Sequence, residues 1–188
     1  MKAEMNVNSR RIGRRQAGVT LVELLIGIVV IGLVIAGVMI AAQKVFTGSE
    51  SNRAASSVAM LASGIKGIYT SASSYAGLTN AVVINGNLAP ESMVSGANLV
   101  NEWGGTVTVA PATLGTVANN AISITYADVP TEACMKLAVQ TATNFDQVTV
   151  DNGTPVNVVT PTNRVVDQAA VATACGGAAT VSMIWQKK

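Results

Sequence analysis

A run of 19 uncharged and mostly apolar residues, from Leu24 to Ala42, limits the fold of this chain more than any other feature. As a helix, at about 1.5 Å per residue, it would extend roughly 28 Å, enough to cross the hydrocarbon core of a bilayer. A buried helix of a soluble protein can look similar, but it rarely has a basic flank on one side only. The run therefore predicts a membrane-spanning helix, in agreement with the high mean hydropathy of +0.43.

The charges of the chain are divided on either side of Gly18. The leader before it sums to +4, whereas the chain from Val19 onward has seven basic and nine acidic residues and sums to −2. Basic residues ahead of an apolar span place the N-terminus in the cytoplasm and the remainder outside. No basic run follows residue 19, so the sequence predicts no nucleic-acid binding.

Three export routes are compatible with such a start. A secretory signal has an apolar region of about 7–15 residues followed by a small-residue cleavage site, and this run is longer and lacks a clean site. A twin-arginine signal is suggested by Ser9-Arg10-Arg11, but the strong hydrophobicity argues against it. The third route cuts after Gly18, before the apolar run, and keeps that run in the mature protein.

The position of Glu23 favours the third route. A carboxylate at the start of an apolar span is costly unless it has a partner. The sequence G-V-T-L-V-E after a basic leader resembles the class III signal of type IV prepilins, with Gly18 before the cut, Val19 first in the mature chain and Glu23 fifth. The 18-residue leader and the non-Phe first residue resemble the type IVb branch.

Further segments are similar to bundle-forming pilin and to the thin-pilus pilins of conjugative plasmids: Ser73–Leu78, Glu132–Cys134 and Asp167–Cys175. The resemblance implies that a prepilin peptidase cuts between Gly18 and Val19 and methylates the Val19 amine. It also implies that Glu23 neutralises this amine on a neighbouring subunit while inner-membrane machinery assembles a helical homo-oligomeric filament. The alternative is that Glu23 is simply solvated at the membrane surface.

The expected fold is α+β, with a long N-terminal helix packed on a small, mainly antiparallel sheet. The expected parts are a leader (1–18), a membrane or filament-core helix (19–44), an amphipathic half-helix (45–72) and a globular head (73–188). The half-helix is predicted from an apolar stripe at helical spacing, made of Val58, Leu61, Ala62, Ile65, Ile68 and Tyr69.

In the head, loops are expected from Ser73 to Gly105, with a short helix near Pro90–Val94. Strands are predicted where polar and apolar residues alternate, at Thr106–Ala110, Ala121–Tyr126, Gln147–Asp151, Val156–Thr160 and Ala179–Trp185. Helices are predicted at Thr131–Thr141, which carries Cys134, and at Val166–Ala174, which Cys175 directly follows. In an exported chain Cys134 and Cys175 are expected to form a disulfide, and two free buried thiols are the alternative.

The sequence contains few residues or motifs that indicate a catalytic or ligand-binding site. It has no histidine and no nucleotide-binding or nucleophile motif, so neither an enzyme nor a cofactor or metal site is expected. Asp146, Asp151 and Asp167 are interpreted as solvated acids rather than cation ligands, and Asn152-Gly153-Thr154 as a hairpin turn rather than a glycosylation site. Trp103 and Trp185 are expected in the core or at subunit contacts.

These observations favour a pilus subunit, with the full-size head indicating a major one. It would be held in the inner membrane with its head in the periplasm, then reach the cell surface for adhesion, aggregation or contact with a host or recipient cell. Two rivals remain: a pseudopilin of a type II secretion system, and a monomeric membrane-anchored periplasmic binding domain. The first fits the size and disulfide of the head poorly, and the second gives Glu23 no role.

Overall fold

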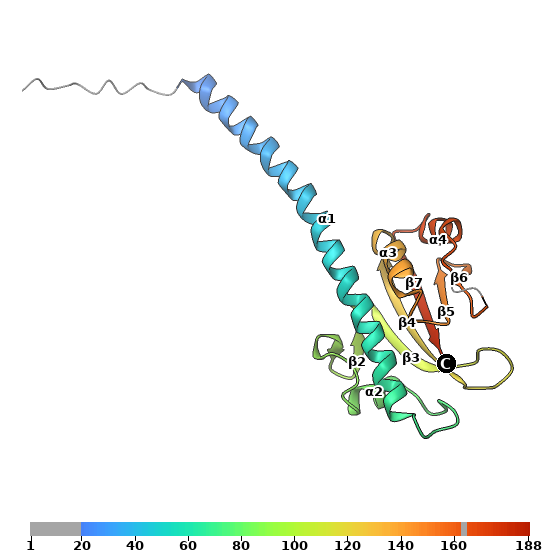
Figure 1. Ribbon diagram of the computed structural model, residues 1–188. Coiled ribbons are helices and arrows are strands. Elements are labelled where there is room, and N and C mark those ends of the chain that lie inside the picture. Colours follow the sequence, from blue (N-terminus) through green and yellow to red (C-terminus); the bar gives the residue numbers. More distant parts are fainter. Residues whose placement is uncertain (1–19, 163–164) are drawn as a thin grey trace, which may run out of the picture. The chain divides into compact units, whose positions relative to one another are not determined.

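The computed structural model describes the backbone of residues 20–162 and 165–188, and the side chains of these residues except 37–47. Two compact units make up the chain, Met1–Ala42 and Gln43–Lys188, and helix α1 (Leu21–Ile68) begins in the first and ends in the second (Figure 1). The predicted processing site at Gly18 and Val19 lies outside the described residues.

Helix α1 confirms the long N-terminal helix expected from the sequence, although it ends at Ile68 rather than near residue 72. Thr70 contributes to this end, because its hydroxyl lies 2.6 Å from the carbonyl oxygen of Gly67. Within the part of the chain that the structure describes, no helix is both long and apolar enough to cross a membrane. The predicted span, Leu24–Ala42, includes residues 37–42, whose side chains lie outside the described part.

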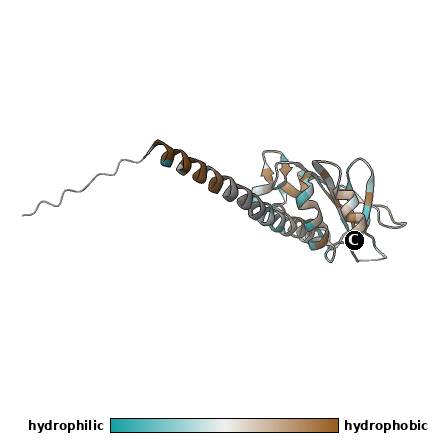
Figure 2. Ribbon diagram, turned by 90° about the horizontal axis from the view of Figure 1, so that it is seen from above, coloured by the Kyte–Doolittle hydropathy of each residue, from teal (hydrophilic) through white to brown (hydrophobic). Residues whose placement is uncertain are grey.

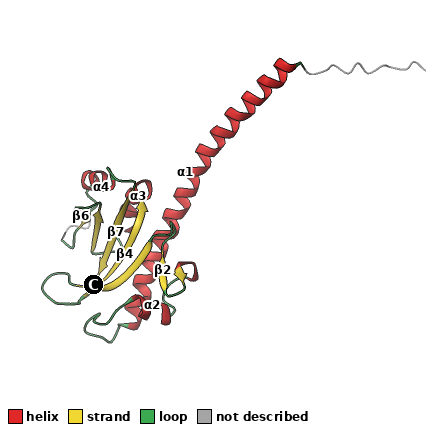
Figure 3. Ribbon diagram, turned by 180° about the vertical axis from the view of Figure 1, so that it is seen from behind, coloured by secondary structure: helices red, strands yellow, loops and turns green. Residues whose placement is uncertain are grey.

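The second unit contains a seven-stranded sheet in which every pairing is antiparallel, in the order β1-β2-β3-β4-β7-β5-β6 (Figure 3). The strands are β1 (Val94–Ser95), β2 (Asn98–Val100), β3 (Thr106–Ala112), β4 (Ala121–Pro130), β5 (Gln147–Asp151), β6 (Pro155–Val159) and β7 (Thr180–Lys187). The last strand in the sequence, β7, therefore lies between β4 and β5 and joins strands β1–β4 to the β5–β6 hairpin.

Short helices connect these strands: α2 (Asn80–Asn85), the 3₁₀ helix η1 (Glu91–Met93), α3 (Thr131–Thr141) and α4 (Gln168–Cys175). The predicted helix at Thr131–Thr141 is confirmed with the same bounds. Helix α4 begins two residues later than expected, because the Asp167 carboxylate accepts hydrogen bonds from the backbone N–H groups of Ala169 and Ala170.

The region from Ser73 to Gly105 is more regular than the predicted loop. It contains α2, β1 and β2 in addition to the expected short helix at η1. Thr79 caps α2, accepting a hydrogen bond from the N–H of Val82, and Asn80 fixes α2 to β3 through bonds to the backbone of Val107 and Val109. A six-residue helix and strands of two and three residues are too short to show a periodicity in the sequence.

One hydrophobic core unites the second half of α1 with one face of the sheet and with α3 and α4. Ala54, Val58, Leu61 and Ile65 are fully buried there, as is Trp185, so the expected core role of this tryptophan is confirmed. Ile68 is a correction to the predicted stripe: its side chain is 50% exposed at the end of α1, whereas Tyr69 is half-buried against the core.

The predicted disulfide between Cys134 and Cys175 is present and links α3 to α4, with 5.8 Å between the Cα atoms. The sulfur atoms are buried with the core rather than at the surface. Both cysteines of the chain are thus accounted for, and the alternative of two free thiols is wrong.

Candidate assembly site

The first turn of α1 holds the carboxylate that the sequence singled out. Thr20 precedes the helix, and its side-chain oxygen accepts a hydrogen bond of 3.3 Å from the N–H of Glu23, while its carbonyl accepts from Leu24. The spacing Thr20-Leu21-Val22-Glu23 has the form of a capping box, in which a threonine at the N-cap is followed three residues later by glutamate. The helix therefore begins where the sequence provides its cap.

Glu23 is exposed, and its carboxylate forms no hydrogen bond or ion pair with the described residues. A negative charge in the first turn interacts favourably with the helix dipole, typically by about 0.3–1 kcal/mol. This is a local reason for an acid at this position, and the sequence reasoning missed it although the T-x-x-E spacing displays it. The predicted partner, the Val19 amine, lies outside the described residues, so the pairing stays a prediction.

Hydrophobic residues follow one another along the first half of α1 (Figure 2), and their large apolar side chains are exposed. Their exposed fractions lie between 52% and 77%, for Leu21, Val22, Leu24, Leu25, Ile26, Ile28, Val29, Val30, Ile31, Leu33, Val34 and Ile35. A Cβ atom placed on Gly27 or Gly32 would have no neighbouring atom of the described chain within 4 Å. Exposed apolar area on this scale marks a surface that is covered by a membrane or by other proteins.

A second group of polar residues lies in the second unit, where the β2–β3 loop meets α1. Asn101 organises this loop: its side-chain oxygen accepts from the N–H groups of Trp103 and Gly105, and its amide donates to the carbonyl of Ala127. Gly105 is required, because a Cβ there would collide with the same carbonyl. The loop is thereby fixed and places Glu102 against α1, where Ser57 donates a 2.8 Å hydrogen bond to its Oε1.

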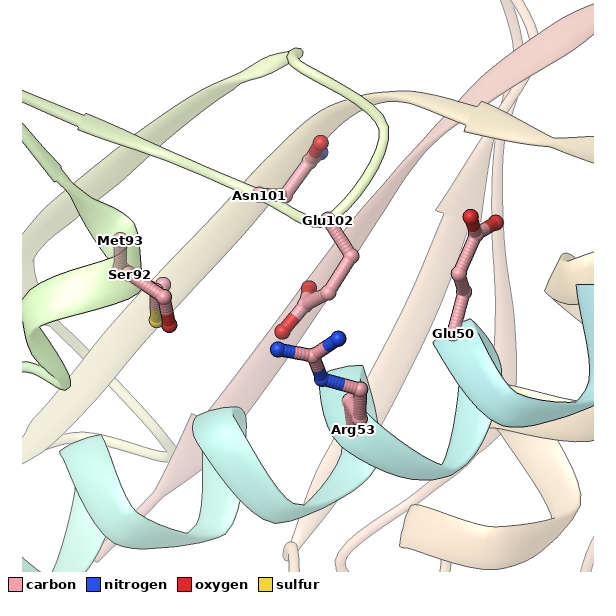
Figure 4. A pocket seen from close by; sticks show the side chains of 6 residues that line it. All are labelled: Glu50, Arg53, Ser92, Met93, Asn101 and Glu102. Atoms are coloured by element: carbon pink, nitrogen blue, oxygen red, sulfur yellow. The ribbon is translucent and has the colours of Figure 1, made fainter. Parts of the chain in front are cut away.

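Beside this contact lies a cavity of about 220 Å³, lined by Glu50, Arg53, Ser92, Met93, Asn101 and Glu102 (Figure 4). The Arg53 guanidinium points toward the Glu102 carboxylate, yet no ion pair between them is formed within the described residues. The other carboxylate oxygen of Glu102, Oε2, is buried and has no hydrogen-bond partner there, and the same is true of the Trp103 indole N–H.

The charge of Glu102 acts on the core behind it. Burial, and secondarily the Glu102 charge, raise the pKa of Tyr126 well above its usual value. The Tyr126 hydroxyl donates to the sulfur of Met93, and its ring packs edge-on against Trp185. None of these residues except Trp185 was identified from the sequence; only the Asn101-Glu102-Trp103-Gly104-Gly105 segment, with a glutamate at a turn, offered a signal.

Asp146, Asp151 and Asp167 each accept hydrogen bonds from backbone N–H groups. The Asp146 carboxylate accepts from the N–H of Lys188, Asp151 accepts from the N–H of Gly153, and Asp167 caps α4. Gly153 has a φ of +104° between β5 and β6, which confirms the hairpin turn at Asn152-Gly153. Among the described residues no group of three or more potential metal ligands occurs.

Comparison with known proteins agrees with this architecture. The family model described as "PilS N terminal" matches residues 48–186, and the one described as "Prokaryotic N-terminal methylation motif" matches residues 13–39. Together they define a non-enzymatic structural subunit of the pilin class. More specifically, the chain belongs to the type IVb pilin family that PilS represents.

Two relatives are described as the major structural subunit of bundle-forming pilus, from Escherichia coli O111:H- and from Escherichia coli O127:H6 (strain E2348/69 / EPEC). Each is 29% identical over 161 residues, covering 85% of this chain and 82% of the relative. The predicted resemblance to bundle-forming pilin is thus confirmed at the level of the family.

Solved structures share the fold. The type IV b pilin from Salmonella typhi aligns with a TM-score of 0.56 and 23% identity, covering 71% of this chain and 97% of that one. TcpA, a type IV pilin from Vibrio cholerae El Tor biotype, aligns with a TM-score of 0.58 and 15% identity, covering 74% and 99%. The predicted α+β class is confirmed.

Proposed function

We propose that this chain is the major structural subunit of a type IVb-like pilus. Family membership implies filament assembly and processing by a prepilin peptidase. The description of the two E. coli relatives as major subunits supports the major role for this chain.

The observation that carries the proposal is the division of α1. Its first half exposes apolar side chains all around, whereas its second half is built into the core of the head. Removing apolar surface from water is favourable by roughly 25 cal/mol per Å². The first half therefore gains its stability from an environment outside the chain: the bilayer before assembly, and the α1 helices of other copies afterwards.

Processing prepares this helix for assembly. A prepilin peptidase cuts between Gly18 and Val19, within the segment that matches the methylation motif, and methylates the new Val19 amine. In the filament the Glu23 carboxylate of one copy pairs with the Val19 amine of its neighbour. Attraction between opposite charges is much stronger in a low-dielectric bundle than in water, although desolvation offsets much of it, so the pair sets register more than stability.

The subunit waits in the inner membrane with its head in the periplasm and is then extruded as a surface filament. We propose contact with other cells as its role, by adhesion, aggregation or mating-pair formation. Its partners are other copies of the chain, the peptidase and the inner-membrane assembly machinery, and a host or recipient-cell surface.

The test combines two measurements on cells that produce the full chain. The proposal predicts a mature N-terminus at Val19 carrying one methyl group, and filaments in surface material removed by shearing and viewed by electron microscopy. A processed chain found only in short periplasmic assemblies would instead identify a pseudopilin. An uncut leader and no filaments would identify a monomeric membrane-anchored binding domain.

A further inference from the structure

The head carries two surfaces of complementary chemistry. The first, the Glu102 surface, consists of Glu50, Arg53, Met60, Pro90 and Glu102 on α1, at the start of η1 and on the β2–β3 loop. The second, the α3 surface, consists of the exposed residues Glu132, Met135, Lys136 and Val139 of α3. Both belong to the second unit of the chain and do not overlap.

The Glu102 surface contains a buried carboxylate oxygen that lacks a hydrogen-bond donor among the described residues. Oε1 of Glu102 is held by Ser57, but Oε2 is buried at the wall of the cavity and has no hydrogen-bond partner among the described residues. Burying a charged acceptor without a donor is unfavourable. Asn101 and Gly105 fix the backbone of the loop, and turning the carboxylate toward solvent would break its hydrogen bond from Ser57. A cationic donor entering the cavity removes this penalty.

The α3 surface offers such a donor. Met135 and Val139 are 47% and 50% exposed and flank Lys136 along the helix. Other lysines of the head have contacts: Lys66 donates to the carbonyl of Lys188, and the ammonium of Lys187 lies 5.7 Å from the centre of the Phe145 ring. No hydrogen bond or ion pair of the Lys136 ammonium occurs among the described residues. Glu132, Met135, Val139 and Gln140 surround this lysine on α3, and its ammonium lies near Gly48 of α1.

Each surface also carries the opposite sign. Arg53 points toward Glu102, and Glu132 lies one helical turn before Lys136. Exposed apolar side chains accompany the charges on both sides, since Met60 is 56% exposed. Complementary charge patterns fix the register of an interface and disfavour other orientations.

We infer that the α3 surface of one copy docks onto the Glu102 surface of the next, with the Lys136 ammonium entering the cavity and pairing with Glu102 Oε2. The inference rests on the proposed function, because it describes a contact between the heads of neighbouring subunits in the same filament. Two different surfaces make the contact, so it is heterologous, and such contacts propagate into open helical assemblies rather than closed dimers.

The first experiment is a double-mutant cycle in the full chain, using the isosteric Glu102→Gln and the charge-removing Lys136→Gln. The readout is sheared filament mass relative to processed subunit in the membrane. Each single variant should lower this ratio by about tenfold or more, as expected when one partner of a buried charge pair is removed. The double variant should lower it no further, because both changes remove the same interaction.

Lys188→Gln is the matched control, because Lys188 is an exposed lysine outside the α3 surface. Lys188→Gln alone should leave the ratio at the value of the unaltered chain. Added to Glu102→Gln, it should leave the ratio at the value of Glu102→Gln alone. Losses that multiply in the Glu102→Gln/Lys136→Gln variant, or normal filaments from both singles, would overturn the pairing. Retention of the Cys134–Cys175 disulfide and resistance to trypsin serve as the fold check.

Cysteine cross-linking tests the contact without altering either charge. Ser92 lines the cavity and Met135 lies beside Lys136, and both are exposed. Oxidised filaments of Ser92→Cys/Met135→Cys should give a ladder of dimers, trimers and longer species on a non-reducing gel, whereas each single variant gives monomers. Normal filaments that yield only monomers from the double variant would refute the inference and leave the proposed function intact. Absence of filaments from the unaltered chain would refute the function itself.

Discussion

The two halves of α1 belong to one helix and place their apolar residues differently. In the first half twelve large apolar side chains are exposed by 52% or more, in all directions around the helix. In the second half the buried residues Ala54, Val58, Leu61 and Ile65 recur at spacings of three and four, and of the large apolar residues described there only Met60 and Ile68 are exposed. The spacing of apolar residues, rather than their number, separates a helix that packs on its own chain from one that needs other molecules.

This difference separates folding from assembly. The second unit contains the core, the sheet and the disulfide, and none of the first unit's described residues belongs to that core. Changes in the first half should therefore affect filaments and leave the stability of the head unchanged, and changes in the second half should affect stability first. We expect a fragment of residues 45–188 to fold by itself, which allows the two effects to be measured separately.

The largest effect is expected from blocking the cut. Gly18→Leu should prevent processing, because the peptidase needs a small residue before the scissile bond, and filaments should be lost completely while the unprocessed chain accumulates in the membrane. Gly18→Ala is the control and should still be cut. Mass spectrometry of the N-terminus and electron microscopy measure both steps, and filaments built from uncut Gly18→Leu subunits would contradict the account.

Next comes the disulfide, which acts on the head alone. Cys134→Ser opens a loop of about 42 residues and should lower the free energy of unfolding of the 45–188 fragment by about 4 kcal/mol in the chain-entropy model. Urea denaturation measures this value. A loss below about 1 kcal/mol would show that the core alone holds α3 and α4 together.

A matched pair of leucines tests the two halves directly. Leu61→Ala removes a fully buried side chain and should destabilise the head by about 2–5 kcal/mol. Leu25→Ala, at a position 54% exposed, should not change the thermal unfolding of the head in the full chain, but it should reduce filament yield. Equal destabilisation by both substitutions would mean that the first half of α1 also supports the head.

The smallest effect concerns Tyr126 and alkaline pH. Its pKa is raised in the folded head, mainly by burial, so the folded state retains a proton that the unfolded state loses above about pH 10. Stability from this residue is thus complete below pH 10 and falls as the pH rises further. Tyr126→Phe should cost about 1 kcal/mol at pH 7, through the lost hydrogen bond to Met93, and should weaken the decline above pH 10. Urea midpoints at pH 8 and pH 11 measure the difference, and parallel declines would exclude Tyr126 as the titrating group.

Much of this fold can be predicted from the sequence because its main elements are long and periodic. The apolar stripe of α1, the alternation in β5 and β7, and the Pro-Thr start of α3 all leave local signals. The position of β7 between β4 and β5 leaves none, because strand order depends on contacts between residues far apart in the sequence.

The candidate sites differ in the same way. The segment Gly18–Glu23 is recognisable because processing reads a linear sequence, and even there the capping role of Thr20 was missed. The Glu102 surface joins residues from α1, η1 and the β2–β3 loop, so only the folded chain brings them together. A lone glutamate before a tryptophan gives no indication that half of its carboxylate is buried without a partner.

The central claim is that Glu23 acts through its charge in the assembled helix bundle, and the capping box provides a sharp test. Glutamine satisfies the same capping pattern as glutamate but carries no charge. Filament mass relative to processed subunit in the membrane should therefore be nearly abolished by both Glu23→Gln and Glu23→Ala, since removing one partner of a buried pair costs roughly 3–5 kcal/mol. Normal filaments from Glu23→Gln, with loss only in Glu23→Ala, would show that Glu23 begins the helix and has no electrostatic role in assembly.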